Sequence, residues 1–230
     1  MAGEMVKTEA ICLGIHPWSR TSHVTSWLTP AGRIVTVVKG AVRPKSAFLG
    51  QYDLNYTCEI LYYARSKGDL HALRECTPLD SRDFLRDDYR TLVLAEHFRH
   101  IAAELTPGGP EAEEWYATLE TALDSLRGIS DEELLPVMLD FERRTLTLSG
   151  VWPEIPADGG ELTINGDRRI PVPAATAACL SDPLNERNPK ILLDAGRVIS
   201  VLYALNLELA ADPRRSVLQL ICKSEQGKGK

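Results

Sequence analysis

The sequence has 230 residues and a formal net charge of -6 at pH 7, with 44% hydrophobic and 25% charged residues. This composition is ordinary for a soluble globular protein that buries a core. No stretch approaches the roughly 18 consecutive apolar residues that a bilayer span needs, and the N-terminus lacks the apolar segment of a signal peptide, so a cytoplasmic protein with no membrane partner is expected.

Five strand patterns occupy the first third of the chain. Each is rich in β-branched or aromatic residues or alternates apolar with polar positions, as half-buried strands do. The patterns cover residues 8–15, 22–29, 33–39, 51–63 and 70–76. No helical period separates them, which favours a small closed barrel of the OB-fold type, although an SH3-like barrel has the same pattern.

The hydrophobic period changes after residue 79. Asp80 and Ser81 are expected to cap a first helix, whose apolar residues recur at three- and four-residue steps as far as Leu105. Ser130 and Glu133 have the spacing of a capping box for a later helix. The further helices are predicted over residues 111–127, 131–149 and 189–210, with a short one after residue 213.

These patterns predict an α+β fold with two domains. Residues 1–79 form an N-terminal OB-fold-like five-stranded β-barrel, and residues 80–230 form an α-helical domain. A small hairpin insertion is expected at about residues 155–187, where Asn165-Gly166 is a turn signal. Charge supports the division, because residues 1–78 hold nine Lys/Arg and six Asp/Glu whereas residues 79–230 hold 17 and 26. The two parts are therefore expected to have different partners.

The basic residues of the N-terminal part gather in one stretch. No Asp or Glu occurs between residues 10 and 52, where five cations lie: Arg20, Arg33, Lys39, Arg43 and Lys45. The last three, with Ser46, belong to the run Lys-Gly-Ala-Val-Arg-Pro-Lys-Ser at 39–46. A patch of one sign in an acidic chain attracts polyanions, so these six residues are predicted to bind DNA. The alternative is a solvated loop whose lysines serve solubility.

Trp18 and Trp27 lie in the same basic part of the chain. Aromatic side chains on an open barrel face can stack on unpaired bases. Either tryptophan can equally fill the barrel interior, because aromatic residues dominate small cores. The sequence leaves both interpretations open for each of them.

No motif for catalysis or metal binding is present. The sequence has no G-x-S-x-G, phosphate-loop or H-E-x-x-H pattern, and its five cysteines form no C-x-x-C pair. Buried free thiols are expected, without structural zinc. His97 and His100 are assigned to a solvated helix surface rather than to a metal site, because no further ligand set accompanies them. Nothing in the sequence argues for an enzyme or for a cofactor.

Arg143 and Arg144 are adjacent on a predicted helix. They can hold an acidic peptide, or they can be an exposed pair that answers Asp140 and Glu142.

The order of these features resembles the RecO family of bacterial recombination mediators. That family has an LT…G turn between strands, here residues 28–32, and then a KGARR-KS-like loop, here residues 39–46. Its helical part has an FE..LL...G..P signature, and a final segment is echoed by residues 215–218. The signature is matched here by Phe141, Glu142, Leu146, Gly150 and Pro153.

Two features depart from the family pattern. Many members carry a four-cysteine zinc site after the G..P element, whereas residues 154–183 contain only Cys179, so zinc is not carried over. Val42 stands where a basic residue is common in the loop, which predicts weaker DNA binding than in a typical member.

The resemblance implies a non-enzymatic DNA repair protein of the RecFOR pathway, at the bacterial nucleoid. Such proteins bind single- and double-stranded DNA, anneal complementary strands, and work with RecR to load RecA on DNA coated by single-stranded-DNA-binding protein (SSB). The acidic C-terminal tail of SSB is expected to dock on the helical part, near Arg143 and Arg144.

A second class of function stays open. The protein can be a non-catalytic interaction adaptor whose barrel binds an acidic protein tail and has no role with nucleic acid. DNA affinity at physiological salt separates the two hypotheses. A hydrolase with an unrecognised site is a third.

Overall fold

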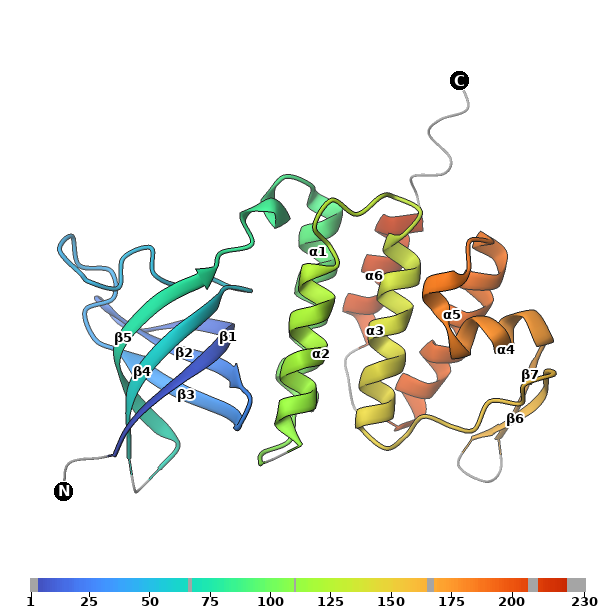
Figure 1. Cartoon of the computed structure of the whole chain (residues 1–230), viewed down its shortest axis with the longest axis horizontal. Helices are drawn as coiled ribbons and strands as arrows, with labels where there is room; N and C mark the ends of the chain where they lie inside the picture. The colour runs from blue at the N-terminus through green and yellow to red at the C-terminus, as the bar shows by residue number, and fades with distance from the viewer. Residues whose placement is uncertain (1–3, 66–67, 110, 165–167, 207–210, 223–230) are drawn as a thin grey trace. The chain divides into compact units, whose positions relative to one another are not determined.

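The computed structural model describes residues 4–65, 68–109, 111–164, 168–206 and 211–222. The chain divides into two compact units. We call residues 1–87 with 99–124 the barrel unit, and residues 88–98 with 125–230 the helical unit. The predicted α+β order of five strands followed by helices is confirmed (Figure 1). The predicted boundary after residue 79 lies at the end of the fifth strand, whereas the units divide within and after the helices that follow.

Five strands close into a barrel in the barrel unit, in the order β1-β2-β3-β5-β4. They are β1 (Glu4–Ser19), β2 (Ser22–Thr29), β3 (Gly32–Val38), β4 (Thr57–Ala64) and β5 (Leu70–Asp80). The pair β3–β5 is parallel and the other pairs are antiparallel. β1 completes the barrel because its first half pairs with β4 and its second half with β2.

The strand predictions are confirmed for β2 and need correction for β4. β2 has the predicted bounds, whereas β4 begins at Thr57 rather than at residue 51. Asn55 adopts a positive φ of 66°, and the Tyr56 N–H donates to the Asp53 carbonyl at 3.2 Å. A strand cannot run through such a tight turn. The apolar residues of this segment alternate as they would in a strand, so the sequence pattern does not reveal the turn.

The barrel interior is enclosed and mostly apolar, with the buried hydroxyls of Thr25 and Thr36 among its side chains. Trp27, Val38, Cys58 and Ile60 each have 0% of their surface exposed. The thiols are free, as expected from the scattered cysteines, and burial raises the pKa of Cys12 far above its ordinary value. These cysteines therefore act as small apolar core residues.

Two helices and a short 3₁₀ turn follow the barrel: η1 (Asp83–Arg86), α1 (Tyr89–Leu105) and α2 (Ala112–Asp124). The predicted helix cap at Asp80 and Ser81 is wrong. Arg82 has a positive φ of 45°, so no α-helix can continue from residue 81, and α1 begins only at Tyr89. Asp88 instead accepts the Arg90 N–H at 2.9 Å, at the start of α1. Within the barrel unit, α2 packs on β2 and β3.

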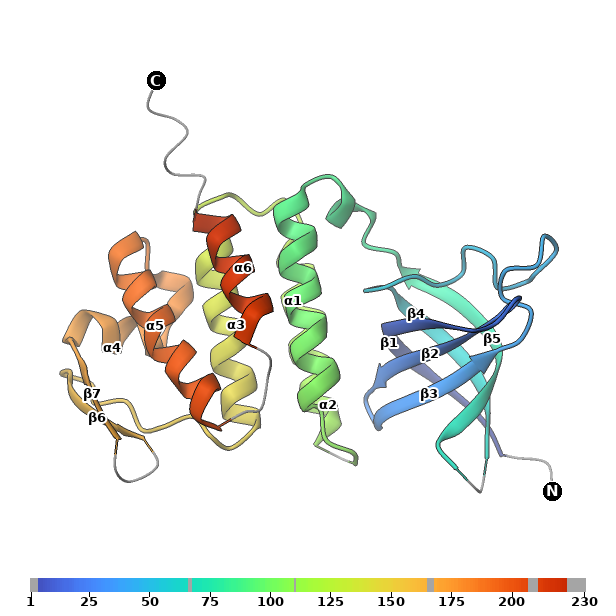
Figure 2. The ribbon, with the colours of Figure 1, turned by 180° about the vertical axis from the view of Figure 1, so that it is seen from behind.

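The helical unit is built around α3 (Leu134–Leu148), which packs against α5 (Pro189–Asn206) and α6 (Ala211–Cys222) (Figure 2). The predicted capping box is only half formed. Ser130 N–H and Oγ–H both donate to Glu133 Oε2, at 3.0 and 2.7 Å, but the Glu133 N–H donates to the Ser130 carbonyl at 3.1 Å and not to the Ser130 hydroxyl. α3 begins later than predicted, at Leu134, with Glu133 at its N-cap and no side-chain cap there.

The predicted hairpin is present as β6 (Gly160–Ile164) paired with β7 (Arg168–Val172), and its Asn165-Gly166 turn lies outside the described residues. The sequence did not reveal α4 (Ala174–Ser181), which is followed by the 3₁₀ turn η2 (Pro183–Asn185). The Ala-Ala-Thr-Ala-Ala segment of α4 has no contrast between apolar and polar positions from which a helical period can be read.

Candidate nucleic-acid interface

The β1–β2 turn and the loop after β3 meet at one end of the barrel. Ser19 and Ser22 pair across the turn. The Gly40 N–H donates to Ser22 Oγ at 3.3 Å, and the Val42 N–H donates to the Thr21 carbonyl at 3.4 Å. We call residues 18–22 and 39–46 the basic rim. Two segments some 20 residues apart in the sequence are thus held side by side by backbone contacts.

Four of the predicted DNA-binding cations belong to the basic rim and are exposed: Arg20, Lys39, Arg43 and Lys45. Within the part of the chain that the structure describes, none of the four forms an ion pair. No carboxylate occurs between residues 10 and 52 to supply one. Their charge is therefore uncompensated locally, and the rim attracts anions.

The loop of the basic rim is shaped by its own backbone. Gly40 has a positive φ of 68°, and a Cβ at this position would lie 3.2 Å from Arg43 Cδ. The Arg43 side chain thus folds over Gly40, while the Arg43 N–H donates to the Gly40 carbonyl at 3.1 Å. Ser46 Oγ accepts the Phe48 N–H at 3.2 Å, so this hydroxyl holds a turn and keeps its own proton to donate.

Arg33 is separated from the other predicted cations. It lies at the start of β3, whereas Lys39 directly follows the end of that strand, so about 20 Å of extended chain lies between them. Its guanidinium donates to the carbonyl of Ala103 within the barrel unit. Arg33 therefore fastens the opposite end of the barrel to a helix, and the rim contains four of the five cations.

The two tryptophans have different roles. Trp27 is 0% exposed, and its Nε1–H donates to Thr36 Oγ1 at 2.9 Å inside the barrel. Trp18 lies one residue before the end of β1, within the basic rim, and 64% of its surface is exposed. Trp27 fills the core, and Trp18 is available to a ligand.

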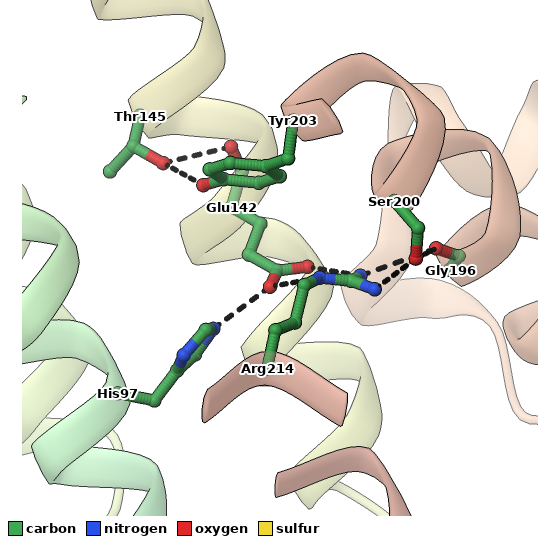
Figure 3. Close-up of polar contacts among 7 residues, drawn as sticks. All are labelled: His97, Glu142, Thr145, Gly196, Ser200, Tyr203 and Arg214. Carbon is green, nitrogen blue, oxygen red and sulfur yellow. Dashed lines mark hydrogen bonds and ion pairs between the residues drawn. The ribbon is translucent and has the colours of Figure 1, made fainter. Parts of the chain in front are cut away.

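A buried polar cluster occupies the helical unit (Figure 3). Glu142 of α3 has a fully buried side chain and forms a two-point ion pair with Arg214 of α6, from Nε to Oε1 and from Nη2 to Oε2, both at 2.7 Å. His97 Nε2 lies 2.9 Å from Glu142 Oε1. Arg214 also donates to Ser200 Oγ and to the Gly196 carbonyl of α5. One carboxylate thus ties together α1, α3 and α6.

The assignment of His97 to a solvated surface is wrong, because its side chain is only 3% exposed. The partners that bury it are far away in the sequence and give no local signal. Burial alone raises the pKa of Glu142, but the charge of Arg214 and the hydrogen bonds from His97 and Arg214 outweigh it and hold that pKa below its ordinary value. The Glu142 carboxylate has partners on both oxygens, which suits a structural role, although His97 Nδ1 is buried without a hydrogen-bond partner among the described residues.

Arg143 and Arg144 both contact Asp140. Arg143 Nη2 lies 2.9 Å from Oδ1, and Arg144 Nε lies 2.7 Å from Oδ2. Glu142, which the sequence offered as a second partner, faces Arg214 instead. Asp140 therefore offsets part of the charge that these arginines would present to an acidic peptide.

A pocket of about 420 Å³ lies elsewhere on the helical unit. Its apolar lining comes from Ile129, Pro136, Val137 and Leu184, and Arg187 adds an exposed cation. Glu133 also lines it, and Arg187 is among the groups that lower the pKa of this carboxyl after its hydrogen bonds with Ser130. A pocket of mixed polar and apolar lining beside a cation is a second place on this unit for an acidic peptide.

Among the described residues, no group of three or more His, Cys, Asp or Glu side chains is arranged to hold a metal ion. None of the described helices is both long enough and apolar enough to cross a membrane.

The sequence matches no protein-family model and has no significant similarity to a curated protein. The geometry of the basic rim therefore carries the functional argument.

Proposed function

We propose that the protein binds nucleic acid through the basic rim, as a non-catalytic DNA-binding mediator of the RecO type. The observation that carries this proposal is the convergence of Arg20, Lys39, Arg43 and Lys45 at one end of a closed barrel, exposed and without carboxylate partners among the described residues. Clustered, exposed cations can neutralise several phosphates of one strand, and this kind of binding requires no catalytic group.

The strand arrangement supports the OB-fold part of the proposal. OB-folds are five-stranded barrels that bind oligonucleotides on one face and on the loops beside it. The closed order β1-β2-β3-β5-β4 with a parallel β3–β5 pair is compatible with that class. The rim is built from the β1–β2 turn, the position of one of the binding loops in OB-folds.

The partners in this proposal come from the RecO resemblance alone. They are single- and double-stranded DNA, RecR and the acidic tail of SSB, with RecA as the protein whose loading is assisted. The resemblance also places the protein in the bacterial cytoplasm, at the nucleoid.

The site of the SSB tail can be tested on the helical unit. Fluorescence anisotropy with a tail peptide compares Arg143→Ala/Arg144→Ala with Arg187→Ala, which changes the pocket. A loss of affinity only in Arg187→Ala would assign the binding site of the tail to the pocket. This is the expected outcome, because Asp140 already pairs with Arg143 and Arg144. If both variants bind the peptide as tightly as the wild type, neither the surface at Arg143 and Arg144 nor the pocket is the binding site.

The salt dependence of binding to a labelled oligo(dT) tests the DNA-binding function. Four phosphate contacts predict a slope of about -2.8 for log K against log[salt], at about -0.7 per contact with a single strand. Arg43→Ala/Lys45→Ala should make the slope shallower by about 1.4. A matched control, Lys190→Ala/Arg197→Ala, removes two exposed cations of α5 and should leave the slope unchanged.

An unchanged slope in Arg43→Ala/Lys45→Ala excludes the basic rim as the DNA-binding surface. The adaptor hypothesis then leads, and binding of an acidic protein tail to the rim becomes the next measurement.

A further inference from the structure

We propose that Trp18 stacks on an unpaired base and makes the basic rim selective for single strands over duplex DNA. This inference rests on the proposed function, since it needs a nucleic acid at the rim. It assigns to the rim a contact that is not electrostatic and a class of substrate.

The position of Trp18 carries the first step. Its neighbour Ser19 pairs with Ser22, and Ser22 and Thr21 hold the loop that contains Gly40 and Val42. Trp18 is therefore one residue away from the junction between the two segments of the rim. A strand that runs along the rim cations passes this side chain.

The exposure of Trp18 carries the second step. A tryptophan buries about 150–250 Å² when it finds a partner surface, and this one leaves 64% of its surface in water. Its counterpart Trp27, in the next strand, is completely buried. Single exposed apolar residues are common on protein surfaces. Here, however, Val42 and Leu49 are also exposed, at 48% and 58%, in the loop that carries Arg43 and Lys45. An aromatic side chain beside cations is typical of surfaces that bind single strands.

The chemistry of bases carries the third step. An unpaired base offers its π-face to an aromatic ring, whereas the base faces within a duplex are already stacked on one another. Rim cations attract the phosphates of both forms. Stacking on Trp18 is open to unpaired bases, so its removal should weaken the binding of single strands much more than that of duplex DNA.

Equilibrium binding of oligo(dT) and of a duplex of equal length, at one salt concentration, tests the inference. Trp18→Ala should weaken binding to the single strand by about 5- to 150-fold, the range that stacking on one base provides. Duplex affinity should stay within about twofold. Trp18→Phe should restore most of the loss because it keeps an aromatic face, whereas Trp18→Leu should not. The salt slope should be the same in all these variants because no charge changes.

Intrinsic fluorescence gives a second readout. The chain has four tryptophans, and Trp27 and Trp115 are only 0% and 2% exposed. Oligo(dT) should quench the emission of the wild type, and Trp18→Phe should remove most of this quenching. Melting temperatures should agree among the variants, since the side chain is exposed.

The outcomes separate this inference from the proposed function. Undiminished single-strand affinity in Trp18→Ala, together with a loss in Arg43→Ala/Lys45→Ala, overturns the inference and leaves the DNA-binding proposal in place. An equal loss for single strand and duplex also overturns it. If the wild type binds neither form at low salt, both proposals fail.

Discussion

Arg82 lies between β5 and η1 with 2% of its surface exposed and a positive φ of 45°. Its guanidinium donates to the Asn55 carbonyl at 2.7 Å and to Thr57 Oγ1 at 2.8 Å, and its Nε lies 2.8 Å from Asp124 Oδ1. Arginine is usually a surface residue, but here its buried side chain links the start of β4 to the end of α2. The planar five-donor fork of arginine suits this task, and the point charge of lysine does not.

Arg82→Ala should lower the free energy of unfolding by at least about 2 kcal/mol, since each buried group that loses its partner costs about 1–3 kcal/mol. Arg82→Lys should recover only part of this loss, because it cannot reach three partners at once. Urea denaturation provides the measurement. Arg74→Ala, at an exposed position of β5, is the control and should stay within about 0.5 kcal/mol. If the two alanine variants are equally stable, Arg82 has no such linking role.

At the scale of elements, Glu142 connects three helices of the helical unit through Arg214 and His97. Glu142→Gln should cost about 3–5 kcal/mol near neutral pH, because it leaves the largely buried Arg214 without its counter-charge. Glu161→Gln changes an exposed carboxylate of β6 and should be nearly neutral.

The pH dependence has a definite sign. The pKa of Glu142 is lowered in the folded protein, so its contribution to stability is complete above the unfolded value of about 4.3 and is lost as pH falls through the folded pKa. The difference in unfolding free energy between wild type and Glu142→Gln should therefore shrink on acidification below about pH 4. A difference that grows instead would contradict the ion pair as its source.

The close packing of the segment before β6 against the junction of β7 and α4 depends on Gly159. Its φ is +76°, and a Cβ there would lie 2.5 Å from the Ala174 backbone nitrogen. Gly150 has a similar φ of +71° with nothing within 4 Å. Gly150→Ala should cost about 1–2 kcal/mol from the left-handed backbone alone. Gly159→Ala should cost clearly more by chemical denaturation, because it adds a clash with backbone that cannot move aside. Equal losses would mean that the hairpin relaxes freely.

At the scale of the whole molecule, charge is distributed unevenly, with a surplus of cations before residue 79 and of carboxylates after it. The cations of the basic rim are expected to contact phosphates, which carry no sequence information. Arg43→Ala/Lys45→Ala should therefore weaken binding equally for all DNA sequences. Competition between oligonucleotides of different sequence measures this. The melting temperature should change by no more than about 2–4 °C, since exposed charges contribute at most about 1 kcal/mol. A loss confined to one DNA sequence would indicate contacts to base edges instead.

The sequence by itself determined the features that depend on near neighbours in the chain. The bounds of β2, the contact between Ser130 and Glu133 and the carboxylate-free basic stretch could be read directly, because alternation, short-range hydrogen bonds and charge act over a few residues. The tertiary structure alone decided which distant residues meet. It separated Arg33 from the four rim cations, placed Trp27 in the core and Trp18 in water, and buried His97 against Glu142. The physical reason is that burial and ion pairing depend on strand closure and helix packing, which bring together side chains dozens of residues apart and leave no periodic signal in the sequence.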